Sequence, residues 1–198
     1  EFYDKLLAAR PKKLSILGTT YADRRHARQI AKARSLPLAG EYLHPMVAIY
    51  DLVSSGRIGN RAFIEASRAL FRRSLRTSRV SFTCGSGLEY PLRKMLEIPA
   101  AGTVLATRPT RTTQSLGFVP WENFVPSTPE DLPRVMDSIA QMRYSDIQVL
   151  ADKGQQLVRD RHSLTARVPM TAEVVELILR SAFAGSYWQH GDHVVRGS

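Results

Sequence analysis

The sequence predicts an α/β fold: a Rossmann-like parallel sheet with helices on both of its faces. Short apolar runs that suit buried strands alternate with helix-length segments along the chain, which is the pattern of strand–helix–strand units. Three glycines, Gly18, Gly85 and Gly102, fall close to the ends of these segments. The chain has 198 residues, 43% of them hydrophobic, which suffices for one domain with a sizeable core. We expect residues 1–183 to form this domain, with closing helices at its carboxyl end, and residues 184–198 to be a tail.

The first predicted strand–helix unit contains a candidate phosphate-binding turn. An apolar run, residues 14–17, leads into Gly18 and Thr19, after which a helix-length segment begins. The first amide groups of a helix lack partners within it and carry the positive end of the helix dipole, so they bind phosphate oxygens well. Arg24 and Arg25 lie just beyond this turn and would add positive charge to it.

A second strand is predicted at residues 36–42, and a mostly helical region follows at residues 46–75. One side of this region is apolar and the other is strongly basic. The basic residues are Arg68, Arg72, Arg73, Arg76 and Arg79. A row of arginines of this kind is either a solvated helix face or a surface for a membrane, a polyanion or another domain.

Residues 85–107 form the stretch around which the chain is organised. An apolar, strand-like run, residues 79–84, precedes it, and a second run, residues 103–106, closes it. Between them lie a glycine-rich turn that includes Ser86 and Gly87, and a helix-length segment. The stretch therefore predicts a strand, a tight turn, a helix and a strand, with bare backbone where a ligand can approach closely.

Two carboxylates and an arginine mark the predicted helix of this stretch. Glu89 and Glu97 are eight residues apart, slightly over two helical turns, so both lie near one face of a helix. Small or rigid residues follow Glu97 and leave room beside it, which suits contact with a ribose diol. Arg93 stands one turn before Glu97, where it can pair with that carboxylate or contact a phosphate.

The carboxyl-terminal third is predicted to be mainly helical. An extended stretch is expected at residues 118–126, and helices at residues 132–142, 144–161 and 171–183. The first of these helices has a strong start signal at Ser127 and Thr128 with Pro129 behind them. His190, Asp192 and His193 are the residue types of a metal site, but polar chain ends often carry such residues by chance, and no metal is expected.

The charge and composition limit the partners. Lys and Arg number 28 against 18 Asp and Glu, a net charge of +10, which favours nucleic acid, anionic lipid or a phosphorylated ligand. The lone Cys84 excludes an internal disulfide and suits a reducing compartment. No apolar run spans a bilayer, so we expect a cytoplasmic protein that can also lie peripherally at an anionic membrane surface. The chain begins without Met at Glu1 and ends Gly197-Ser198, which suggests a piece of a larger protein.

Two motifs resemble those of retaining GT-B glycosyltransferases of the group-1 type, in a bacterial-like subfamily. Glu89 and Glu97, followed by Ile98-Pro99-Ala100-Ala101-Gly102, resemble the Glu-x7-Glu region of the nucleotide-sugar-binding, carboxyl-terminal half of these enzymes. Arg93 with Glu97, and His162-Ser163 with Arg167, resemble the Arg-x3-Glu and His-Ser/Thr-x3-Arg signatures of the subfamily. In order and spacing the resemblance covers residues 12–181. One departure is Tyr90-Pro91-Leu92, which replaces the usual Gly-Phe-Gly.

The resemblance implies transfer of a sugar from a nucleotide diphosphate sugar to an acceptor, with retention at the anomeric carbon and without a metal or cofactor. It assigns Glu97 to the ribose hydroxyls and Glu89 to the reacting sugar as the catalytic residue. The diphosphate would be held by a set of small and basic residues: Gly18, Thr19, Arg24, Arg25, Ser86, Gly87 and Arg93. His162 and Arg167 are expected to be structural. The resemblance also implies a missing amino-terminal domain, without which the half is inactive.

Two other classes of function remain open from the residues. The first is a non-catalytic, basic α/β module that binds nucleic acid or another polyanion through its arginine face. The second is a dinucleotide oxidoreductase, which is disfavoured because Gly18-Thr19-Thr20-Tyr21-Ala22-Asp23 stands where a Gly-x-Gly-x-x-Gly fingerprint would be.

Overall fold

The computed structural model describes residues 14–16, 22–34, 38–39, 61–83 and 90–197. Within this part of the chain, five strands form one parallel sheet in the order β2-β1-β3-β4-β5. The strands are β1 (Leu14–Ile16), β2 (Leu38–Ala39), β3 (Val80–Phe82), β4 (Val104–Thr107) and β5 (Val125–Pro126). The predicted α/β fold class is therefore confirmed. Each crossover between parallel strands needs a helix or long connection, which places helices over the sheet.

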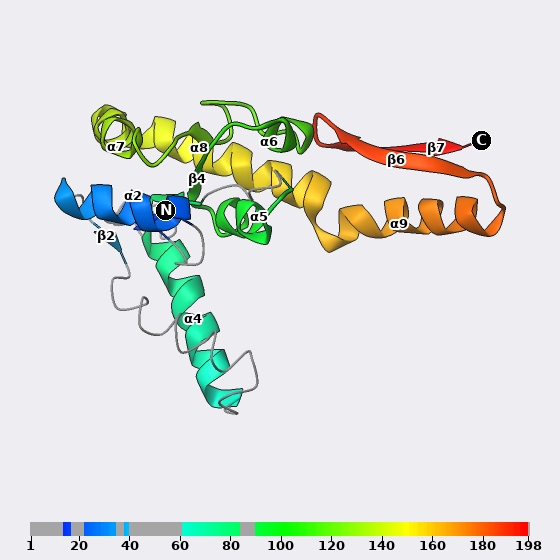
Figure 1. Cartoon of the computed structure of the whole chain (residues 1–198), viewed down its shortest axis with the longest axis horizontal. Coiled ribbons are helices and arrows are strands. Elements are labelled where there is room, and N and C mark those ends of the chain that lie inside the picture. Colours follow the sequence, from blue (N-terminus) through cyan, green and yellow to red (C-terminus); the bar gives the residue numbers. More distant parts are fainter. Residues whose placement is uncertain (1–13, 17–21, 35–37, 40–60, 84–89, 198) are drawn as a thin grey trace.

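Helices cover both faces of this sheet (Figure 1). The larger helices are α2 (Ala22–Ala33), α4 (Arg61–Thr77), α5 (Arg93–Ala100), α7 (Leu132–Gln141), α8 (Tyr144–Leu157) and α9 (Leu164–Leu179), and α6 (Arg111–Ser115) is a short one. Helix α8 crosses the domain, and α4 extends away from it in Figure 1. Helix α9 projects beyond the sheet, beside the hairpin of β6 (Phe183–Gln189) and β7 (Asp192–Gly197).

Strand alternation divides the core into two layers. Phe82 of β3 pairs in register with Ala106 of β4, and both side chains join a cluster with α2, α7 and α8. Leu105, one position earlier on β4, faces the opposite side and packs with Met95 and Ile98 of α5. Successive strand side chains point to opposite faces, so apolar residues at consecutive positions of β4 serve both layers. Burial of each large side chain contributes about 1.5–3 kcal/mol.

The predicted capping residues Ser127 and Thr128 and the predicted first-turn Pro129 lie before α7, whose N-cap is Asp131 without a side-chain cap bond. The Thr128 hydroxyl donates to the Asp131 carboxylate over 3.0 Å, and the Asp131 amide donates back to the Thr128 hydroxyl over 3.3 Å. These reciprocal bonds satisfy amide and hydroxyl groups that a helix start leaves unpaired. The regular helix begins at Leu132, and its end at Gln141 is one residue short of the predicted Met142.

The carboxyl-terminal residues differ from the prediction of a tail. Residues 183–197 form an antiparallel hairpin of β6 (Phe183–Gln189) and β7 (Asp192–Gly197). Gln189 pairs with Asp192, so the loop is the two residues His190 and Gly191. Both have positive φ, 51° and 88°, which is the two-residue turn whose twist matches paired strands. The prediction missed this hairpin because histidine is an unusual residue in the first position of such a turn.

The last helices also differ in their bounds from the predicted ones. Helix α8 ends at Leu157, and a π-helical turn (Val158–His162) continues it. Helix α9 begins at Leu164, seven residues before the predicted start at Thr171, because the Ser163 hydroxyl accepts from the Ala166 amide and caps it. The stretch 118–126, predicted to be extended, is a set of turns in which only Val125–Pro126 is a strand of the main sheet.

Candidate functional site

The topology places side by side the two strands that precede the predicted phosphate-binding turns. Strands β1 and β3 are parallel neighbours, and from β1 the chain proceeds to β2 on one side, whereas from β3 it proceeds to β4 on the other. This is a topological switch point, and ligands of open α/β sheets bind beyond the strands' carboxyl ends there. Gly18 and Thr19 come soon after β1, and the loop with Ser86 and Gly87 follows β3.

Most of the predicted contacts belong to residues outside the described part of the chain. These are Gly18, Thr19, Ser86, Gly87 and Glu89. Arg24 and Arg25 lie in the first turn of α2, although their side-chain surroundings are not among the described features. Arg93 and Glu97 are the two predicted site residues whose side chains the structure describes.

Arg93 and Glu97 form an ion pair on α5. The Arg93 Nε and Nη2 atoms both lie 2.6 Å from Glu97 Oε1. The Arg93 side chain is 87% exposed and that of Glu97 is 28% exposed, so the pair lies at the surface with its carboxylate partly sheltered. The predicted pairing is present, and whether either residue contacts a nucleotide stays a prediction.

The position of Arg93 does little for the helix itself. It is the first residue of α5, and no acidic residue or side-chain cap stabilises this helix start. A cation at the positive end of a helix dipole is unfavourable, and an arginine four residues before a glutamate is the weaker order for a helical ion pair. A positive group at an uncapped helix start is instead well placed for an anionic ligand.

Two buried hydroxyls at the carboxyl edge of the sheet lack partners. Thr83 directly follows β3, Thr107 ends β4, and both residues are fully buried. Among the described residues, neither Oγ1 atom has a hydrogen-bond partner. They follow Phe82 and Ala106, which are paired in register, so they are neighbours across the two strands. Buried polar groups are nearly always paired, and the sequence signal was too ordinary to single these threonines out.

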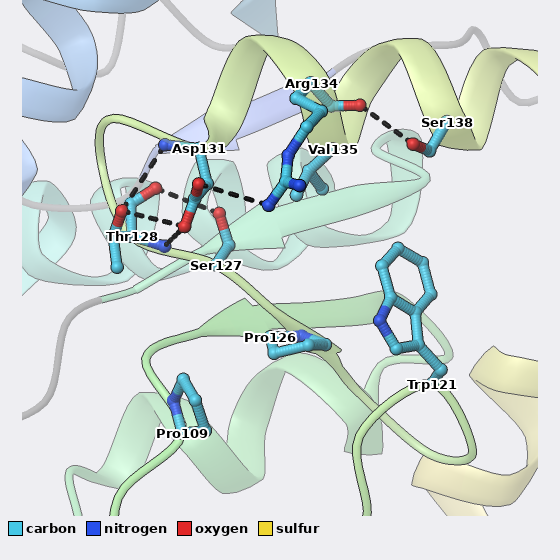
Figure 2. Close-up of a pocket in the computed structure, with 9 residues that line it drawn as sticks. All are labelled: Pro109, Trp121, Pro126, Ser127, Thr128, Asp131, Arg134, Val135 and Ser138. Carbon is cyan, nitrogen blue, oxygen red and sulfur yellow. Dashed lines mark hydrogen bonds and ion pairs between the residues drawn. The ribbon is translucent and has the colours of Figure 1, made fainter.

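A pocket of about 330 Å³ lies beside the edge strand β5, and Figure 2 shows its lining. The lining residues are Pro109, Trp121, Pro126, Ser127, Thr128, Asp131, Arg134, Val135 and Ser138. Of the predicted site residues whose side chains the structure describes, neither Arg93 nor Glu97 lines this pocket.

His162 and Arg167 act as structural residues in the described geometry. His162 Nε2 lies 2.8 Å from the Leu116 carbonyl oxygen, and its Nδ1 lies 3.1 Å from Arg167 Nη2. A carbonyl only accepts, so Nε2 carries the proton and Arg167 donates to Nδ1. Burial lowers the pKa of His162, the bond to Leu116 opposes this, and the charge of Arg167 lowers the pKa further. The neutral ring packs against Trp188 of the hairpin in a tilted arrangement, with 5.1 Å between ring centroids.

The arginine face predicted in the first half is largely exposed. Arg72, Arg73 and Arg76 of α4 are exposed, and Arg68 is paired with Glu65 at 2.8 Å. Arg79 departs from the prediction: it follows α4, is half-buried, and lies over the ring of Tyr144 at 5.3 Å. Within the described ranges, α4 thus presents a strongly positive surface.

The described residues contain no group of three His, Cys, Asp or Glu side chains arranged to hold a metal ion. In the hairpin, Asp192 instead pairs with Arg161, and the His193 ring packs at a tilt against Trp188 with 5.1 Å between ring centroids. In the same part of the chain, no helix is both long and apolar enough to cross a bilayer.

Comparison with known proteins shows the fold. No family model matches the sequence, and no curated protein matches it. Among solved structures, the chain is similar to sucrose-phosphate synthase from Thermosynechococcus elongatus, with a TM-score of 0.56 and 15% sequence identity. The similarity covers 88% of this chain and 47% of that chain, so this chain spans about half the length of its structural neighbour. The chain therefore has a Rossmann-like α/β fold, similar to that of about half of this neighbour.

Proposed function

We propose that this chain is the donor-binding half of a retaining GT-B glycosyltransferase, which transfers a sugar from a nucleotide diphosphate sugar to an acceptor. The observation that carries the proposal is the switch point between β1 and β3. The turns after these two strands are the glycine-containing turns that the sequence marks for phosphate, and α5 with its glutamate follows the second of them.

Each group has a role in this proposal. Glu97 accepts hydrogen bonds from the ribose hydroxyls, and Arg93 beside it orients the carboxylate or contacts phosphate. The amides of Ser86 and Gly87, with Arg24 or Arg25, hold the diphosphate, and Glu89 lies near the sugar. The unpartnered hydroxyls of Thr83 and Thr107 support a polar ligand at this edge, because such a ligand would satisfy them.

The chemistry of the proposed reaction is stabilisation of the leaving group. As the glycosidic bond breaks, negative charge builds up on the diphosphate, and fixed backbone donors and arginines lower the energy of that charge. The residues assigned to this task need no metal ion or cofactor in the proposed mechanism.

We propose that a second domain of the same protein completes the enzyme and supplies the acceptor side. The chain covers only 47% of the length of its structural neighbour, which leaves room for such a domain. Helix α9 also exposes apolar side chains, among them Leu164, Val168, Val175 and Leu179. Their spacing of 4, 7 and 4 residues places them on one face, which suits contact with another domain. We expect the whole protein to act in the cytoplasm, where the exposed arginines of α4 can also hold it at an anionic membrane surface.

Calorimetric titration of UDP and GDP tests the proposal. We expect one nucleotide to bind the chain, and Glu97→Gln to weaken this binding at least about tenfold, since a charged hydrogen bond contributes about 1.5–3 kcal/mol. Glu173→Gln, an exposed change on α9, is the matched control and should bind like the parent. Absence of binding by either nucleotide would reject the proposal, and equal binding by Glu97→Gln would remove Glu97 from the site.

A basic module for polyanions is the second candidate, and the exposed arginines of α4 favour it. Binding to a nucleic acid backbone falls linearly with salt on logarithmic axes, whereas a nucleotide held in a pocket depends on salt only weakly. Steep salt dependence that disappears in Arg72→Gln/Arg73→Gln/Arg76→Gln, together with failed nucleotide binding, would establish this second function in place of the first.

A further inference from the structure

The pocket beside β5 combines an apolar floor with polar groups along one side (Figure 2). Pro109 follows β4, Pro126 belongs to β5, and Trp121 comes from the loop before β5. The start of α7 supplies Asp131 and Arg134. Its volume of about 330 Å³ lies at the lower end of the range of small-molecule sites, about 300–1,000 Å³, so it fits a ligand with one or two rings.

Trp121 is held in an unfavourable backbone conformation. Its φ is 62°, in the left-handed region that bulky side chains seldom adopt. Such a conformation costs about 1–3 kcal/mol and persists where the surrounding structure imposes it, often at a functional site. The residue is also 47% exposed, so the indole gains only part of the burial that would compensate for this strain.

The loop that carries Trp121 is rigid. The Trp121 amide donates to the Phe124 carbonyl over 2.8 Å. The buried Asn123 side chain accepts from the Val119 amide over 2.8 Å and donates to the Gly117 carbonyl over 3.0 Å. These bonds hold the loop backbone whether or not the indole is present. The indole is therefore a pre-oriented aromatic surface, which lowers the entropy cost of ligand binding.

The polar side of the pocket offers both donors and acceptors. Arg134 pairs with Asp131 over 3.3 Å but is 81% exposed, and a guanidinium has five N–H groups, so donors remain for a ligand. The hydroxyls of Ser127 and Ser138 donate to the carbonyls of Thr128 and Arg134, which leaves their oxygens as acceptors.

The charges in the pocket favour an uncharged ligand. The carboxylate of Asp131 offsets the guanidinium of Arg134, and its negative charge at the N-cap of α7 opposes the binding of an anion there. A phosphate therefore gains little here. A molecule with several hydroxyls, each able to donate and accept, matches the mixture of groups.

We propose that this pocket binds a carbohydrate ring, with the Trp121 indole against the apolar face of a pyranose and with Arg134, Ser127 and Ser138 hydrogen-bonded to its hydroxyls. The amphipathic indole suits a ligand that has one apolar face and a polar rim. The pocket adjoins Thr107, which pairs with Pro126 across β4 and β5, but the inference stands on the pocket's own residues and does not rest on the proposed glycosyl transfer.

Nuclear magnetic resonance of the 198-residue chain tests the proposal directly. The chain has two tryptophans, and the ¹⁵N-labelled protein will show two indole Nε1–H signals, of which Trp121→Asn removes that of Trp121. The probes are the methyl glycosides of glucose, galactose, mannose and N-acetylglucosamine and their disaccharides, with uridine and guanosine as comparators that offer an aromatic base but no pyranose ring. We expect a saturable shift of the Trp121 signal with at least one saccharide.

Two variants separate a binding role from a packing role. Asparagine tolerates positive φ, so Trp121→Asn should fold with unchanged or higher stability and lose saccharide binding when measured by calorimetry. Arg134→Met should weaken the binding at least about fivefold, whereas Tyr187→Ala, an exposed aromatic on the hairpin, should leave it unchanged. The proposal is overturned if no saccharide saturates the shift, if only a nucleoside does, or if Trp121→Asn binds like the parent. A marked loss of stability in Trp121→Asn would equally overturn it, because the indole would then be a packing residue.

Discussion

The carbonyl oxygen of Asn123 lies so close to Gly154 that a Cβ on this glycine would be 2.7 Å from it. Gly154 sits inside α8 and is buried, and its missing side chain lets the helix approach the loop that carries Trp121. Lys153 of the same helix pairs with Glu122 of the loop over 3.3 Å. Helix α8 and this loop are therefore joined by a close backbone contact as well as by charge.

Gly154→Ala should destabilise the protein, although alanine is the better helix former by about 1 kcal/mol. The new methyl group would meet backbone, which cannot swing aside, and overpacking of this kind costs about 1–3 kcal/mol. We expect a lower thermal midpoint in calorimetric melting. Asp152→Ala, an exposed change two residues earlier, is the control and should change stability little. A Gly154→Ala protein that melts higher than the parent would contradict the close approach.

Thr107→Val should raise stability while it weakens nucleotide binding. The Thr107 hydroxyl is buried without a partner among the described residues, so an apolar group of the same shape removes a desolvation cost of roughly 1 kcal/mol. If the hydroxyl contacts the nucleotide, affinity falls by about two- to tenfold.

Thr103→Val is the matched control, at the residue just before β4. The Thr103 hydroxyl donates to the Leu75 carbonyl over 2.5 Å, so its loss should lower the unfolding free energy by about 1 kcal/mol. Denaturant titrations of both variants give the comparison. Destabilisation by Thr107→Val would contradict the prediction, because it would show that the Thr107 hydroxyl has a hydrogen-bond partner in the folded protein.

His162 should make stability fall as the pH drops below about 6.5, its ordinary pKa. The folded protein lowers the pKa of His162, so in this window the unfolded chain binds more protons and stability rises with pH. The contribution is complete above the ordinary pKa and is lost as the pH falls toward the folded-state value. His162→Gln keeps an N–H group for the Leu116 carbonyl but does not titrate.

Unfolding free energies of the parent and His162→Gln, measured from pH 8 to pH 5, test this coupling. As the pH decreases, the unfolding free energy of the parent should fall relative to that of His162→Gln. Parallel pH profiles would mean that the ring titrates alike in the folded and unfolded states.

Asn123→Asp should destabilise the loop before β5 and disturb Trp121. The change replaces the donor that faces the Gly117 carbonyl at 3.0 Å with a carboxylate oxygen, in a residue that is 8% exposed. A buried acceptor left without its donor costs about 1–3 kcal/mol. Denaturant unfolding gives the loss of stability, and the Trp121 indole signal should shift without any ligand. An unchanged indole signal would mean that the Asn123 side chain does not hold this loop.

Local signals were sufficient for much of this fold. Apolar runs bounded by glycine predicted β3 and β4, because a strand buried on both faces is apolar at consecutive positions. Ser127, Thr128 and Pro129 predicted a helix start close to that of α7, which begins at Leu132, since cap and first-turn residues are local signals. The pairing of Arg93 with Glu97 followed from the helical repeat. In each case the residues that make the structure are neighbours in the sequence.

Only the tertiary structure decided the features that depend on distant segments. In the hairpin at residues 183–197, Trp188 packs against His162, which is 26 positions earlier. The sheet order makes β1 and β3 neighbours, and neither strand's own sequence indicates this. The strain at Trp121, the unpartnered hydroxyl of Thr107 and the pocket beside β5 likewise appear only when separate elements pack together. The sequence determined which short segments form helices and strands, and long-range packing determined which of their side chains meet, because local conformation depends on neighbours along the chain whereas a site depends on neighbours in space.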